Sequence, residues 1–62
     1  MTCRKILDRF LELFPNYKDE IFSYKKNLAD LNSDSIVITL KNTRRIIFTA
    51  TKNSDCLQIL HY

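Results

Sequence analysis

Residues 35–62 limit the fold more than any other part of the chain. They hold three short stretches rich in β-branched and aromatic residues, at 35–41, 44–52 and 55–62. Polar clusters typical of tight turns separate these stretches. Strands joined by short turns pair with their chain neighbours in antiparallel fashion. This half of the chain is therefore predicted to form a three-stranded β-meander.

The first hairpin of this meander has two alternative registers. A two-residue loop at Asn42 and Thr43 would set Ile38 opposite Ile47, whereas a three-residue loop sets Ile38 opposite Ile46. A slip of one residue exchanges the two faces of a strand, so the apolar pattern selects between the two loops. We predict the three-residue loop, because it gathers the isoleucines on one face.

The second hairpin is predicted to turn through two residues, 53–54. That turn places Phe48 opposite Ile59 and, on the other face, Ile47 opposite Leu60. The predicted buried face then carries Ile36, Ile38, Leu40, Ile46, Phe48, Ala50, Leu57 and Ile59, with His61 at its edge.

The N-terminal residues 3–13 predict an amphipathic helix. Apolar residues recur there at the spacing of one helical face: Ile6, Leu7, Phe10, Leu11 and Phe14. Thr2 is a suitable N-cap, and Pro15 ends the helix because the residue before a proline avoids helical dihedrals. Arg9 and Glu12 are spaced for an ion pair on the exposed side.

Residues 16–31 fit two structures. An apolar stripe at helical spacing indicates a second amphipathic helix: Tyr17, Ile21, Tyr24, Leu28 and Leu31. Yet 21–26 is also good strand sequence and Phe22 lies off that stripe, so a helical turn over 16–20 followed by a fourth strand is the alternative. In both cases we expect one α+β domain, 1–62, with N-terminal helical segment(s) on one face of an antiparallel meander of three strands, or four if 21–26 are extended.

Composition excludes several classes of function. The chain of 62 residues has no glycine, so the Gly-rich loops that cradle phosphates are ruled out. Cys3 and Cys56 belong to no CxxC pair and one histidine is present, so we expect no metal site and no cofactor. No stretch reaches the length of a membrane span, and free thiols fit a reduced cytoplasmic setting.

Catalytic groups are not evident in the sequence. His61 is the single histidine, and Cys56 points to the other face of the third predicted strand. A Cys–His pair would also need a third group to orient it. We expect no catalytic residues and a protein that is not an enzyme.

The face of the meander turned away from the helix is the first candidate surface. Ile47, Leu60 and Tyr62 form an apolar cluster there beside Arg45, and exposed clusters of this kind mark partner surfaces. Alternatively, a second helix or a fourth strand covers part of this cluster, which then has a structural role. These four residues are predicted to bind a protein partner or a second copy of the chain.

The first hairpin tip is the second candidate surface, with Lys41, Arg44 and Arg45. Guanidinium groups on a β-ribbon suit contacts with phosphates, and the net charge of +3 permits weak attraction to nucleic acid. All phenylalanines read as core, however, so the aromatic platform of a single-strand binder is missing. Basic side chains on hairpins also guard strand edges against aggregation.

The sequence thus favours a small non-catalytic protein-interaction module. Lysine, isoleucine and asparagine are frequent in this chain, which is typical of proteins from AT-rich genes. Small AT-rich genes are common in phages and mobile elements. We therefore expect the module to be an inhibitor of a host system, of the anti-defence type. The alternative is a nucleic-acid-binding module that grips phosphates with the basic hairpin tip.

Overall fold

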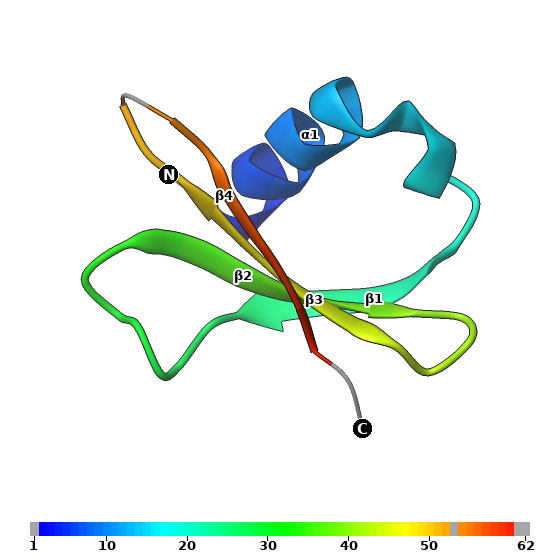
Figure 1. Cartoon of the computed structure of the whole chain (residues 1–62). Helices are drawn as coiled ribbons and strands as arrows, with labels where there is room; N and C mark the ends of the chain where they lie inside the picture. Colours follow the sequence, from blue (N-terminus) through cyan, green and yellow to red (C-terminus); the bar gives the residue numbers. More distant parts are fainter. Residues whose placement is uncertain (1, 53, 61–62) are drawn as a thin grey trace.

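One helix and four antiparallel strands build the molecule. The computed structural model describes residues 2–52 and 54–60. Helix α1 (Cys3–Leu13) and the 3₁₀ turn η1 (Pro15–Tyr17) precede four strands: β1 (Ile21–Lys26), β2 (Asp34–Leu40), β3 (Arg45–Ala50) and β4 (Cys56–Leu60). The sheet order is β1-β2-β3-β4, and α1 lies across one face of it (Figure 1). The predicted α+β meander is confirmed in its four-stranded form.

Helix α1 begins and ends as its residues predict. The Thr2 side chain accepts a hydrogen bond from the Lys5 backbone N–H at 3.2 Å, which caps the first turn. Pro15 follows the C-cap residue Phe14 and opens η1. Arg9 makes its ion pair with Asp55, at 3.0 Å, which ties the helix to the start of β4.

Residues 21–26 form strand β1, so the second amphipathic helix is wrong and the extended alternative is right. Ile21 pairs with Leu40, and the register then shifts before Ser23, which marks a β-bulge. The extra residue allows both Ile21 and Tyr24 to pack against the core although they are three positions apart. Phe22 is the residue displaced by the bulge, and its side chain is 74% exposed.

The first hairpin has the predicted three-residue loop. The Leu40 N–H donates to the Arg44 carbonyl at 2.8 Å, and Ile38 pairs with Ile46. Thr43 closes the loop with a φ of 71°, in the left-handed region. Since the chain has no glycine, a β-branched residue adopts this conformation, at a cost of about 1–2 kcal/mol.

The core lies between α1 and the three strands β1, β2 and β3. Phe10 of the helix meets Phe48 of β3 edge to face, with ring centroids 5.3 Å apart, and neither ring is exposed. The buried residues comprise three of the helix and six of the predicted sheet face: Ile6, Leu7, Phe10, Ile36, Ile38, Leu40, Ile46, Phe48 and Ala50.

The second hairpin differs from its predicted register by two residues. Phe48 pairs with Leu57 instead of Ile59, because the ladder ends at Thr49 and Cys56 and the midpoint of the connection lies one residue earlier in the chain than predicted. The Asp55 carboxylate accepts a hydrogen bond from the Thr51 N–H at 3.4 Å while it binds Arg9 through its other oxygen. These side-chain contacts replace ladder pairs. A shift of two residues leaves every side chain on its predicted face.

Leu57 and Ile59 lie on the predicted face but are not buried. They are 38% and 45% exposed, because α1 packs against β1, β2 and β3 and leaves β4 uncovered. His61, predicted at the edge of this face, lies outside the described residues.

Candidate interaction surface

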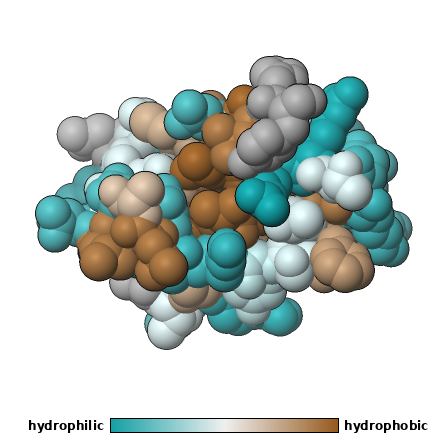
Figure 2. Space-filling view, turned by 90° about the horizontal axis from the view of Figure 1, so that it is seen from below, coloured by the Kyte–Doolittle hydropathy of each residue, from teal (hydrophilic) through white to brown (hydrophobic). Residues whose placement is uncertain are grey.

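The outer face of the sheet, turned away from α1, is the side seen in Figure 2. The register assigns these strand residues to it: Ser23, Lys25, Ser35, Val37, Thr39, Arg45, Ile47, Thr49, Cys56, Gln58 and Leu60. None of these residues is acidic, and two are cationic. The outer face therefore lacks acidic side chains such as those that α1 carries, Asp8 and Glu12.

Three aliphatic side chains form a central patch on the outer face. Val37 of β2 pairs directly with Ile47 of β3, and Leu60 of β4 is the diagonal neighbour of Ile47. All three are only partly buried. Figure 2 shows hydrophobic side chains gathered in the middle of this face.

The predicted partner-binding residues are placed in part by the structure. Ile47 and Leu60 share the outer face with Arg45, as predicted, although Leu60 pairs with Arg45 and Ile47 pairs with Gln58. The predicted direct pair of Ile47 with Leu60 is wrong, because the second hairpin reverses one residue earlier in the chain than predicted, which moves β4 by two residues. Tyr62 lies outside the described residues.

A polar cluster closes one end of the outer face. Ser35 is completely buried there, although it points away from the helix. Its hydroxyl oxygen accepts hydrogen bonds from the Asn27 amide at 3.1 Å and from the Thr49 hydroxyl at 3.0 Å. The Asn27 N–H also donates to the Ser35 carbonyl at 3.0 Å. The segment after β1 is thereby held against the sheet.

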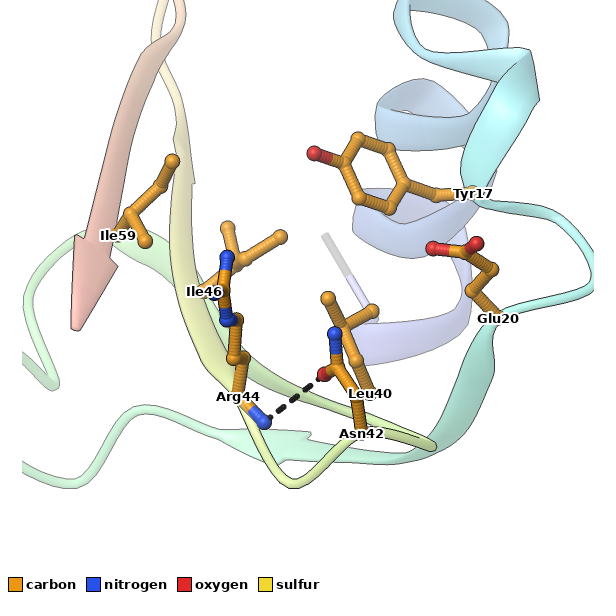
Figure 3. A pocket seen from close by; sticks show the side chains of 7 residues that line it. All are labelled: Tyr17, Glu20, Leu40, Asn42, Arg44, Ile46 and Ile59. Atoms are coloured by element: carbon orange, nitrogen blue, oxygen red, sulfur yellow. Dashed lines mark hydrogen bonds between the residues drawn. The ribbon is translucent and has the colours of Figure 1, made fainter. Parts of the chain in front are cut away.

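The three cationic residues of the hairpin tip, Lys41, Arg44 and Arg45, do not lie on one surface. Arg44 lines a pocket of about 160 Å³ on the helical side, between Tyr17, Glu20 and Ile59 (Figure 3). Its backbone N–H donates to the Asn42 side-chain oxygen at 3.1 Å. Lys41 and Arg45, by contrast, line a hollow on the outer face. The structure thus separates Arg44 from the other two predicted phosphate-binding residues.

The outer-face hollow contains an aromatic residue that sequence reasoning missed. It measures about 310 Å³, and Phe22 lines it together with Thr39, Lys41, Thr43 and Arg45. The expectation that every phenylalanine is core is wrong for Phe22. The extended alternative for 21–26 contained this information. If Ile21 and Tyr24 both face the core, three positions apart, the strand needs a bulge, and a bulge displaces one of the residues between them.

Chemistry-bearing side chains are sparse in the described part of the chain. Across 2–52 and 54–60, no three histidine, cysteine or acidic residues gather in a group able to hold a metal. Cys3 is partly buried and Cys56 exposed, and both are free thiols. No helix among these residues has the length and apolarity to cross a bilayer.

Comparisons with known proteins leave the chain to be interpreted from its own geometry. No protein-family model, no curated protein and no solved structure matches it.

Proposed function

We propose that this chain is a small non-catalytic module that binds a protein partner through its outer sheet face. The observation that carries the proposal is the central patch of Val37, Ile47 and Leu60, which faces away from the helix that covers the core. A sheet backed by a packed core presents such side chains on a rigid support, which limits the entropy lost on binding. Arg45 at the rim of the patch adds a charged contact suited to an interface.

A protein of this kind acts by occupying its target. The composition favours a phage or mobile-element inhibitor of the anti-defence type, and this form of the proposal stays a prediction. Inhibition of this kind requires only that the central patch cover a functional surface of a host protein.

Affinity capture tests the proposal with matched variants. The immobilised chain, Ile47→Asp, Leu60→Asp and Leu31→Asp are each incubated with lysate of the source organism. Leu31 is 66% exposed in the segment between β1 and β2, so Leu31→Asp controls for the added charge. We expect one protein to be retained by the wild type and by Leu31→Asp, and to be lost from both outer-face variants while their melting temperatures show that they fold. Equal retention by the outer-face variants would contradict the proposal.

A second candidate function, binding of single-stranded nucleic acid, is favoured by the hollow around Phe22. An exposed aromatic ring beside Lys41 and Arg45 combines a stacking surface with phosphate-binding cations. Stacking of one base contributes roughly 1–3 kcal/mol, so Phe22→Ala should weaken binding by roughly 5- to 150-fold. Arg44 lies on the other side of the sheet, which makes Arg44→Ala the matched control for Lys41→Ala.

Fluorescence anisotropy with a labelled single-stranded oligonucleotide at low salt provides the measurement. The candidate requires affinity that falls steeply with added salt, because phosphate contacts release counterions. Absence of binding at low salt, or equal losses for Arg44→Ala and Lys41→Ala, would dismiss it.

A further inference from the structure

Strand β4 leaves one edge of the sheet open. The sheet order ends at β4, whose described pairing is with β3 alone. Leu57 and Ile59 stand along this edge on the helical side and are 38% and 45% exposed. Two neighbouring aliphatic side chains with this exposure, on a strand whose second edge is open, form a surface suited to another strand.

The direction of the backbone groups on β4 follows from the first hairpin. Leu40 donates to the carbonyl of Arg44, so these two residues form a hydrogen-bonded pair. Such pairs alternate along an antiparallel ladder, so even-numbered residues of β3 bond to β2 and odd-numbered residues bond to β4. Gln58 therefore bonds to Ile47, and Leu57 and Ile59 direct their N–H and C=O groups to the open edge.

The edge also lacks the features that prevent strands from pairing. The β4 sequence, CLQIL, has no charged residue and no proline. Its ladder with β3 runs without a bulge. Charge, proline and bulges are the usual protection of an edge strand, so β4 is unprotected.

We propose that β4 pairs antiparallel with β4 of a second copy of this chain, about a two-fold axis at Gln58. In this register Leu57 of one copy stands opposite Ile59 of the other, and Cys56 stands opposite Leu60. Every pair that flanks the axis is apolar and none places like charges together. Leu57 and Ile59 of the two copies then exchange about four backbone hydrogen bonds.

The helices leave room for this pairing. A two-fold axis normal to the sheet puts both copies of α1 on the same face. Because α1 packs on β1, β2 and β3, its centre lies over β2, and five strand spacings separate β2 of one copy from β2 of the other, roughly 24 Å. A helix with its side chains is roughly 10 Å wide, so the helices do not collide. The interface is small, and affinity in the micromolar range or weaker is expected.

Sedimentation equilibrium over a range of concentrations tests the association. The mass should rise from the 7.4 kDa of one chain towards twice that value. Leu57→Lys or Ile59→Lys should keep the mass at that of one chain, because each adds a charge to the edge. Leu28→Lys is the matched control, since Leu28 is 74% exposed away from β4, and its mass should rise like that of the wild type.

Disulfide trapping tests the register. Residue 58 meets its counterpart in a non-hydrogen-bonded pair, where Cα atoms lie about 4.5 Å apart, within disulfide range. Gln58→Cys, made with Cys3→Ser and Cys56→Ser, should therefore cross-link under mild oxidation. Cys3→Ser alone keeps Cys56, which lies about 13 Å along the strand from its counterpart and should not cross-link.

The outcomes separate this proposal from outer-face binding, which uses Ile47 and does not depend on β4 pairing. A mass of one chain up to about 1 mM would overturn the proposal, because a weaker association is not a specific dimer. A dimer that persists in Leu57→Lys and Ile59→Lys, or cross-linking of Cys56 as fast as that of Gln58→Cys, would also overturn it.

Discussion

The two edge strands of the sheet, β1 and β4, differ in almost every property that governs strand pairing. Strand β1 contains a bulge and ends in Lys25 and Lys26, while Ile21 and Tyr24 pack against the core. Strand β4 has no bulge and no charge, and its helical side is uncovered. The first edge belongs to the folded core, and the second is held by β3 and by the contacts of Asp55.

This difference shows how a very small protein divides stability from interaction. The helix is long enough to cover three strands, and the residues beneath it supply most of the buried apolar surface. The fourth strand completes the ladder but adds little burial. Its side chains and backbone groups remain accessible for contact, and the bulge and lysines restrict such contact at the opposite edge.

The largest expected effect compares two residues that face each other across β3 and β4. Phe48 is completely buried and pairs with the partly exposed Leu57. Phe48→Ala should cost roughly 3–5 kcal/mol and abolish cooperative melting, because it opens a cavity against Phe10. Leu57→Ala should cost less than about 1 kcal/mol. If urea denaturation showed similar losses of unfolding free energy in Phe48→Ala and Leu57→Ala, β4 would be part of the core and the distinction between the two edges would be wrong.

A smaller effect is expected from Asp55→Ala, which removes the contacts that anchor β4. The Asp55 carboxylate binds Arg9 at 3.0 Å and accepts from the Thr51 N–H, and its side chain is 14% exposed. Its loss should cost roughly 1–2 kcal/mol and speed hydrogen exchange of β4 amides more than that of β1 amides.

Arg4→Ala is the control for this loss of an ion pair. Arg4 and Asp8 form a pair at 3.4 Å with side chains 74% and 55% exposed. Exposed pairs of this kind contribute little, so melting and exchange should stay near those of the wild type. Equal acceleration of exchange in β1 and β4 for Asp55→Ala would mean that the two edges open together.

The smallest effect on stability is expected from Lys25→Val, which removes one charge from the β1 edge. Lys25 is exposed on the outer face, so the free energy of unfolding should change by less than about 0.5 kcal/mol. Self-association should nevertheless increase, because the edge loses part of its protection. Light scattering in the Leu57→Lys background, where β4 pairing is blocked, isolates this effect. An unchanged mass would indicate that the bulge alone protects β1.

Local sequence patterns predicted the helix, its cap, the first hairpin and the faces of the described residues in β2, β3 and β4. Alternation and helical spacing suffice for these features because each depends on residues close in the chain. The exposed Phe22 could have been predicted, since Ile21 and Tyr24 require a bulge once β1 is extended. The divergence of Arg44 from Lys41 and Arg45 also follows from alternation along the hairpin.

The second hairpin and the exposure of β4 could not be predicted in this way. Asp55 binds Arg9, which is distant in the sequence, and this contact together with the Thr51 hydrogen bond holds the connection before β4 in place. The exposure of Leu57 and Ile59 depends on where α1 comes to rest on the sheet. Both features arise from contacts between segments that no local pattern records.

By itself, the order of residues in this chain determined which side chains share a face in α1, β2, β3 and β4, because the periods of helix and strand are properties of the backbone. Only the tertiary structure decided which of those faces are covered. One short helix covers three strands, so the central patch of the outer face and the edge of β4 stay open to solvent in the described chain. Burial is a property of the packed layers, and packing decides which surfaces remain available for function.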